Sequence, residues 1–182
     1  MEFQERFSAR AVAAVGNVPA PVAAEVYALS FLVWNEGDDH RRPVVTIGYN
    51  TEAQVRESLG RASDAGEARW NYAFWLQNEL DVVAAPREWV EELGLWYEEP
   101  EDWPQGWEEV ARPAGGIESA HDAVCRHVAR EMHGSGLIEK VFGRPIPVIL
   151  HELEYFEAVA RRTELANPAG LADEFARWVR EG

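Results

Sequence analysis

The sequence predicts an α+β fold in which a small, mainly antiparallel sheet of three or more strands packs against about six helices. Three short segments are rich in β-branched and aromatic residues, which is typical of strands. The segments between them repeat apolar residues three and four positions apart, as helices do. With 182 residues, the chain has the length of one globular domain, residues 1–182.

The strands are predicted from runs of β-forming residues. The first run ends in Phe31-Leu32-Val33-Trp34 and predicts a central strand. The second run follows a polar turn at residues 35–42, so the two strands are expected to form an antiparallel hairpin. The third run starts with prolines, which strands tolerate at their first residues. The predicted strands cover residues 25–34, 44–49 and 145–150.

The helices are predicted from apolar stripes and from residues that begin or end a helix. The clearest stripe runs from Ile117 to Met132, and Gly134 ends it. In the helix predicted next to the last strand, Leu153 and Phe156 are expected to point inward. The main predicted helices cover residues 2–15, 50–59, 86–97, 117–133 and 152–162, and a last one starts at Asn167-Pro168. A further short helix is expected at residues 137–142.

The segment 69–83 is dense in aromatic residues and leaves two interpretations open. Trp70, Phe74 and Trp75 fit one face of a helix. The alternation of Trp70, Tyr72 and Phe74 would equally suit a strand. We favour a helix for this segment.

The chain is strongly acidic, with a formal net charge of −15 from 32 acidic and 17 basic side chains. Nucleic-acid binders need a positive face that displaces counterions from phosphates, and anionic membranes attract basic segments. We therefore expect no nucleic acid and no membrane among the partners. An acidic surface fits a basic protein such as a toxin, and the alternative is that the charge serves solubility alone.

The compartment is predicted from the single cysteine and from the N-terminus. Cys125 has no partner for an intrachain disulfide, which favours a reducing compartment. The first residues lack the basic and apolar regions of a signal peptide, and no apolar run approaches the roughly 18 residues of a membrane span. We expect a soluble, cytoplasmic protein.

Several landmarks are spread over nearly the whole chain: the strand 26–34, the run Tyr49-Asn50-Thr51-Glu52, the segment 69–75, the strand 146–150 and the pair Asn167-Pro168. Together they resemble a bacterial family of unknown function, domain-of-unknown-function family 4303. Families of this type resemble immunity proteins encoded beside secreted bacterial toxins. The resemblance therefore implies a non-enzymatic, protein-binding domain, and it implies no catalytic residue.

An acidic, tryptophan-bearing loop over residues 98–116 is the strongest candidate for the binding surface. Prolines and glycines exclude a long regular element there. Tryptophans often anchor binding interfaces, and acids around them suit a cationic partner. The alternative is that the tryptophans fold back and cover the core. The candidate partner-binding residues are Trp96, Glu101, Asp102, Trp103, Trp107, Glu108 and Glu109.

The alternative function is that of a small cofactor-free enzyme or small-molecule-binding protein with an aromatic pocket. Such a pocket would be lined by Trp70, Tyr72 and Trp75, with His121 or His151 as the proton carrier. No Walker motif, dinucleotide fingerprint, Gly-x-Ser-x-Gly or His-Glu-x-x-His motif is present in the sequence. No cofactor is expected.

The sequence favours neither a metal site nor a cysteine nucleophile. His121 and Cys125 are four residues apart, so they share a helix face and, with Asp122, form the best metal-like group. Both lie on the apolar stripe, where a small thiol packs as a hydrophobe. A thiol in mid-helix also lacks the surroundings that lower its pKa. We expect no metal and no catalysis by Cys125.

Reversing the charge of Glu101, Asp102, Glu108 and Glu109 together should weaken binding of a basic partner and flatten its salt dependence, since each carboxylate contributes to the attraction. Affinity measured at low and moderate salt checks this expectation. An unchanged affinity would remove this loop from the interface.

Overall fold

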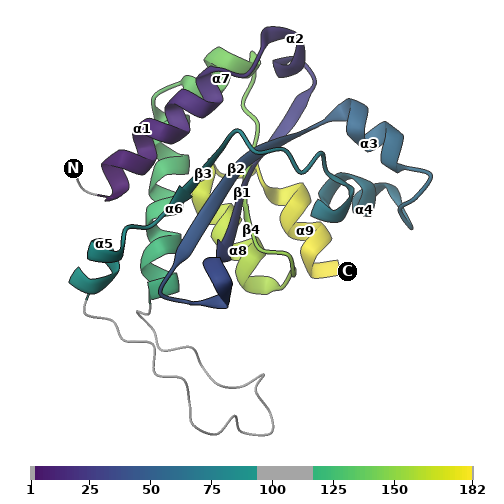
Figure 1. Cartoon of the computed structure of the whole chain (residues 1–182). Coiled ribbons are helices and arrows are strands. Elements are labelled where there is room, and N and C mark those ends of the chain that lie inside the picture. Colours follow the sequence, from purple (N-terminus) through teal and green to yellow (C-terminus); the bar gives the residue numbers. More distant parts are fainter. Residues whose placement is uncertain (1–2, 94–116, 182) are drawn as a thin grey trace, which may run out of the picture.

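A computed structural model of the protein describes residues 3–93 and 117–181, without the side chains at 118 and 119 (Figure 1). Its centre is a four-stranded sheet with the strand order β3-β2-β1-β4. The α+β prediction is confirmed. The strands are β1 (Val26–Asn35), β2 (Pro43–Thr51), β3 (Asp81–Ala84) and β4 (Val148–His151).

The sheet combines the predicted hairpin with a parallel pair. β1 and β2 pair antiparallel from Val26 with Thr51 to Asn35 with Pro43, so the hairpin is confirmed and β1 is central. β2 and β3 are also antiparallel. β4 joins the other edge of β1 in parallel. Two of the three strand pairings are therefore antiparallel, and the end of β4 lies at the same end of the sheet as the end of β1.

Helices pack against both faces of this sheet, and the first of them shows the buried stripe expected from its sequence. Residues four apart on the first helix, Phe3, Phe7, Ala11 and Val15, are all buried. The helices are α1 (Phe3–Gly16), α2 (Ala20–Ala23), α3 (Glu52–Ser58), α4 (Ala65–Trp70), α5 (Arg87–Glu92), α6 (Ile117–Gly134), α7 (Leu137–Phe142), α8 (Glu157–Ala166) and α9 (Asp173–Glu181), with short 3-10 turns η1 (Glu36–Asp38) and η2 (Tyr72–Phe74).

Two cores form because successive residues of a strand point to opposite faces. On one face, Leu29, Phe31 and Leu150 pack with the buried stripes of α1 and α6. On the other face, Ala28 and Ile149 pack with aromatic residues from α4, η2 and α9. This second core is largely aromatic.

The outer edge of β4 is closed by Thr163 of α8 and by Asn167, the residue after this helix, instead of by another strand. The Thr163 hydroxyl accepts a hydrogen bond from the Leu150 N–H at 3.1 Å and donates one to the Leu150 carbonyl at 3.0 Å. The Asn167 amide accepts from the Val148 N–H at 2.8 Å and donates to the Val148 carbonyl at 2.8 Å. An unpaired strand edge invites wrong pairing with another chain, and these contacts satisfy it internally.

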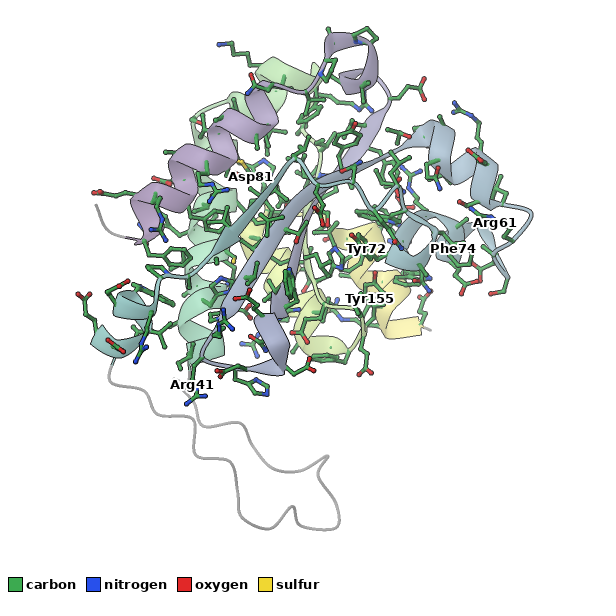
Figure 2. The ribbon with its side chains drawn as sticks, in the orientation of Figure 1. Arg41, Arg61, Tyr72, Phe74, Asp81 and Tyr155 are labelled. Atoms are coloured by element: carbon green, nitrogen blue, oxygen red, sulfur yellow. The ribbon has the colours of Figure 1, made fainter. Side chains whose placement is uncertain are left out.

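The opposite edge, β3, is closed by arginines of α1. Arg10 forms an ion pair with Asp81 and donates to the Val82 carbonyl at 3.0 Å, while Arg6 donates to the Ala84 carbonyl at 3.3 Å. Figure 2 shows Asp81 beside α1, where this contact is made. Both edges of the sheet therefore depend on polar side chains from helices.

The helix favoured for residues 69–83 is wrong. α4 ends at Trp70, and Asn71 and Trp75 have extended backbone around η2. The Asn71 side chain accepts from the Ala73 N–H at 3.0 Å, which starts a turn in place of another helical residue. The last residues of the segment belong to β3, whose Val83 is fully buried.

The predicted start of the helix after β4 is also wrong. Residues 152–156 form a loop, and α8 begins only at Glu157. Leu153 and Phe156, expected to point inward, are exposed. The physical reason is that Tyr155 takes the inward place, where its hydroxyl accepts a hydrogen bond from the Tyr72 N–H at 2.8 Å.

The last helix begins later than predicted, at Asp173. Asn167 is the residue after α8, and its side chain is held by β4, so it closes one helix instead of opening the next. Phe175 of α9 is buried as expected.

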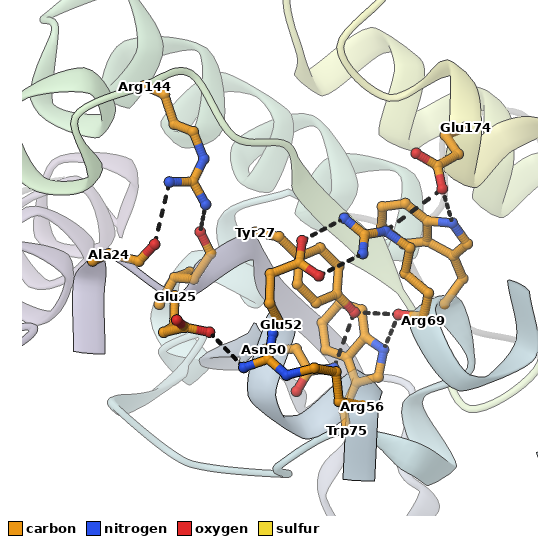
Figure 3. A network of polar contacts seen from close by, with 12 residues as sticks. Ala24, Glu25, Tyr27, Asn50, Glu52, Arg56, Arg69, Trp75, Arg144 and Glu174 are labelled. Carbon is orange, nitrogen blue, oxygen red and sulfur yellow. Dashed lines mark hydrogen bonds and ion pairs between the residues drawn. The ribbon is translucent and has the colours of Figure 1, made fainter. Parts of the chain in front are cut away.

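Arg69 fixes α4 against the sheet and α9 (Figure 3). Its guanidinium donates to both carboxylate oxygens of Glu52, at 2.9 and 3.0 Å, and lies 4.1 Å from the ring centre of Tyr27. Its backbone carbonyl accepts hydrogen bonds from the Tyr27 hydroxyl and the Trp75 indole. The same residue thereby holds the aromatic cluster of the second core in place.

Thr163→Val should destabilise the fold by about 3 kcal/mol, because it keeps the shape but leaves the N–H and carbonyl of Leu150 with fewer hydrogen bonds. Thr163→Ser keeps the hydroxyl and should cost only about 1 kcal/mol for the lost methyl group. Urea unfolding of the two variants checks this. Equal stability of the two variants would show that the hydroxyl does not support β4.

Candidate functional site

The candidate site lies where β1 and β4 end. In sheets with parallel strands, ligands commonly bind beyond the carboxyl ends of those strands. Leu32 of β1 pairs with His151 of β4 in the parallel register. Trp34, two residues further along β1, therefore lies at the same end as the loop 152–156. A histidine cluster, a charged cluster and an exposed apolar surface occur at this end.

The histidine cluster is built around His151, the last residue of β4. Its Nε2 lies 2.8 Å from the Ser30 hydroxyl, and its Nδ1 lies 3.0 Å from the Glu152 carbonyl. A carbonyl can only accept, so Nδ1 carries the proton and Nε2 accepts from Ser30. The rings of Tyr72, Trp75 and Tyr155 surround the imidazole at centroid distances of 5.0, 5.9 and 6.2 Å.

Ser30 and His151 have the contact of a nucleophile with its base, but solvent does not reach them. Ser30 is 2% exposed and His151 is 1% exposed. Burial lowers the pKa of His151 to about 4, and the positive charge of Arg162 acts in the same direction. The imidazole is therefore neutral near pH 7. In this arrangement the pair ties β1 to β4, and a substrate has no route to the hydroxyl.

His121 lies on the opposite face of the sheet from His151. Its ring stacks 5.9 Å from Phe3 of α1 and lies 6.5 Å from Trp89 of α5. Burial lowers its pKa to about 4. Its Nε2 is buried and has no hydrogen-bond partner among the described residues. Of the two histidines predicted as alternative proton carriers, His121 is separated from Tyr72 and Trp75 by the sheet, and His151 contacts them.

Cys125 is fully buried beneath His121, with its sulfur 3.8 Å from His121 Nδ1. Burial raises the pKa of this thiol. The neutral thiol is a poor nucleophile and a poor metal ligand. Within residues 3–93 and 117–181, no group of three or more potential ligand side chains is arranged to hold a metal ion.

A charged cluster links α6, α8 and the end of β4. Arg162 Nη1 lies 2.8 Å from Glu152 and 3.4 Å from Asp122, and Arg162 Nε donates to the Leu150 carbonyl at 3.1 Å. Burial raises the pKa of Asp122 more than Arg162 lowers it. Because both carboxylates already contact the same guanidinium, the cluster anchors the loop 152–156 to the helices.

An exposed apolar surface, which we call the strand-end surface, consists of Trp34, Leu153 and Phe156. Their side chains are 40%, 74% and 39% exposed. The loop carries the acids Glu152 and Glu154 between and beside its apolar residues. Exposed apolar residues at one end of a sheet, with acids between and beside them in the sequence, are features of an interaction surface.

The structure brings together only part of the predicted pocket. Tyr72, Trp75 and His151 are in contact, and Trp70 belongs to the same core through Tyr27 and Phe175. These rings fill the space between sheet and helices. Two hollows at the surface of the described part of the chain lie along α9, and no histidine lines either of them.

The predicted partner-binding residues lie outside the described residues. They are Trp96, Glu101, Asp102, Trp103, Trp107, Glu108 and Glu109.

Several residues of the candidate site are not identified by the sequence analysis. Ser30 is the only serine or threonine of β1 and is flanked by apolar residues, which is a detectable signal of a buried polar contact. Leu153 and Tyr155 fall in a predicted helix, which hides their roles in the loop. Trp178 of α9, whose ring lies 5.0 Å from Tyr155, is not among the predicted site residues.

Comparisons with known proteins provide no relative. No protein-family model, no curated protein and no solved structure matches this chain. The resemblance to family 4303 therefore stays a prediction. No helix in the described ranges is long and apolar enough to cross a bilayer.

Acid should destabilise the fold between about pH 6.5 and pH 4. The pKa of His121 and of His151 falls from 6.5 to about 4 on folding, so the unfolded chain binds more protons in this range. Each histidine then costs about 2 kcal/mol of stability between pH 7 and pH 5. Asp122, whose pKa is raised in the folded protein, makes a contribution to stability that increases as the pH falls.

His121→Met should remove about half of this pH dependence and leave stability at pH 7 unchanged or higher, because the buried Nε2 is unpartnered. Urea unfolding at pH 7 and pH 5 checks this. His127→Gln, at an exposed position on the same helix, is the matched control. The change in its free energy of unfolding between pH 7 and pH 5 should equal that of the wild type. If His121→Met loses as much stability between pH 7 and pH 5 as the wild type does, His121 is not a source of the pH dependence.

Proposed function

We propose that this protein is a non-enzymatic, protein-binding domain whose partner is basic, in the manner of an immunity protein. The observation that carries the proposal is the strand-end surface, Trp34, Leu153 and Phe156, displayed among acids on a chain with net charge −15. Acidic surfaces accelerate the approach of a basic partner, and exposed apolar side chains supply the affinity.

The loop 152–156 supports this role because it is held from inside. Tyr155 packs against Trp178 and accepts a hydrogen bond from the backbone of Tyr72, while Glu152 pairs with Arg162. Figure 2 shows Tyr72 and Tyr155 close together between the sheet and the C-terminal helices. A loop fixed in this way loses little conformational entropy when a partner binds.

Phe156 is a second support. It occupies the residue before α8, where Ser, Thr, Asp or Asn would accept a hydrogen bond from the helix, and its side chain forms no such cap. The chain thus places a partly exposed ring at a position where a polar residue would stabilise the helix. A local choice that does not favour stability is commonly found at functional positions.

The buried state of the histidines favours this proposal over the enzyme alternative. A cofactor-free enzyme needs a proton carrier that its substrate can reach. Ser30 and His151 are enclosed by aromatic rings, and His121 is enclosed by Phe3 and Trp89.

Leu153→Ser and Phe156→Ser should each weaken partner binding about tenfold or more, the effect of removing an interface anchor. Leu59→Ser changes an exposed leucine at the residue after α3, outside the strand-end surface, and should bind as wild type does. The measurement is capture of a stoichiometric basic protein from the source organism by each tagged variant, followed by titration with the purified partner.

Stability controls separate binding from folding. Leu153 is 74% exposed, so its replacement should change the free energy of unfolding by less than about 0.5 kcal/mol. Equal capture by all three variants, or no basic partner at low and moderate salt, would overturn the proposal.

A further inference from the structure

We propose that the hollow between α4 and α9 binds an arginine side chain of the basic partner. This inference rests on the proposed function and names one group that the partner must present. The hollow has a volume of about 450 Å³. That volume lies in the range of small-ligand sites, roughly 300–1,000 Å³, and exceeds what one guanidinium needs. Its lining includes Asp64, Trp70, Glu174, Arg177, Trp178 and Glu181.

The charges of the hollow favour a cation. Three carboxylates line it against a single guanidinium, that of Arg177. Two of the carboxylates already have partners. Asp64 accepts a hydrogen bond from the Glu67 N–H at 2.8 Å, and Glu174 accepts one from the Trp70 indole at 3.3 Å and lies 3.5 Å from Arg69 Nε. Glu181 is exposed and forms no ion pair with a described residue. An anionic ligand would face more carboxylates than guanidinium groups in this lining.

The aromatic lining favours arginine over lysine. A guanidinium is planar, stacks on indole and donates to carboxylates through several N–H groups at once. The protein already uses this combination a few ångströms away, where Arg69 contacts Tyr27 and Trp70 as well as Glu52 and Glu174 (Figure 3). The hollow offers the same residue types to an arginine from outside.

Gly66 lets Trp178 lie close to α4 at the wall of the hollow. A Cβ atom at this residue would lie 3.0 Å from Trp178 Cδ1 and 3.1 Å from an Asp64 carboxylate oxygen. The pyrrole edge of Trp178 therefore faces the backbone of α4 directly. Its indole N–H donates to no group in the described ranges.

One ring contact links the hollow to the loop 152–156. Trp178 packs edge-on against Tyr155 at 5.0 Å, and Tyr155 lies in the loop that displays Leu153 and Phe156. Because the loop and the hollow are joined by this contact, we assign both to one protein partner, which would place an arginine between α4 and α9.

The experiment uses N-acetyl-arginine-N-methylamide as the probe and follows the indole N–H signals of the ¹⁵N-labelled protein by NMR. The chain has eight tryptophans, so Trp178→Phe assigns the signal of interest. The Trp178 signal should shift and saturate with the arginine probe. The citrulline analogue has nearly the same shape without the charge, and it should bind at least about fivefold more weakly.

Two variants with opposite charge changes sharpen the test. Glu181→Gln should weaken probe binding about threefold, and Arg177→Gln should strengthen it about threefold, as expected for exposed ion pairs. Glu139→Gln, on α7, is the matched control and should leave binding unchanged. An unshifted Trp178 signal, equal binding of the citrulline analogue, or weaker binding by Arg177→Gln would overturn the assignment.

Failure of this inference is distinguishable from failure of the proposed function. If the strand-end variants lose a basic partner while the arginine probe leaves Trp178 unchanged, the hollow is not the arginine site but the binding function stands. If the probe binds and no basic partner exists, the hollow recognises a guanidinium and the proposed function is wrong.

Discussion

The hydrogen bonds between α8 and the outer edge of β4 are the contacts on which the C-terminal half of the fold depends. β4 is four residues long and pairs with only one strand, β1. Thr163 and Asn167 supply the hydrogen bonds that a further strand would otherwise make. They lie four residues apart, so one face of a helix reaches two alternate strand residues. Because α8 is fixed in this way, the loop 152–156 and α9 have defined positions against the aromatic core.

A side-chain amide also takes the place of a strand partner on β2, where Asn78 forms hydrogen bonds with the backbone of Tyr49. Its side chain accepts from the Tyr49 N–H at 2.9 Å and donates to the Tyr49 carbonyl at 3.0 Å. The approach is so close that a Cβ on Gly48 would lie 2.6 Å from the Asn78 carbonyl oxygen, which explains a glycine inside this strand. Asparagine amides thus extend a sheet whose outer strands are only four residues long.

The elements that could be predicted are those whose signals are local. The hairpin strands, α1, α6 and α7 follow from composition and spacing along a short stretch. β3 was missed because it has four residues and follows an aromatic segment whose spacing resembles a helix. The loop 152–156 was missed because Leu153, Phe156 and Val159 have helical spacing, whereas Arg162 and Tyr72 hold that segment from distant elements.

The candidate site shows the same limit. Tyr72, Trp75 and His151 were named together from their residue types, and they do pack together. His121 was grouped with them because a sequence does not tell which face of the sheet a helix covers. Strand β4 pairs in parallel with β1, and its successive residues point to opposite faces of the sheet. Leu150 therefore packs on the face that α6 covers, together with His121, and His151 packs on the other face beside η2.

The parallel pair also has a consequence for biosynthesis. Leu29 pairs with Val148, so the central strand leaves the ribosome more than a hundred residues before its second neighbour. Contacts this distant in sequence slow folding. Until β4 and α8 arrive, the nascent β1–β2 hairpin exposes the unpaired edge of an apolar strand. The steps at which this chain most needs protection from aggregation therefore come before its last third has been translated.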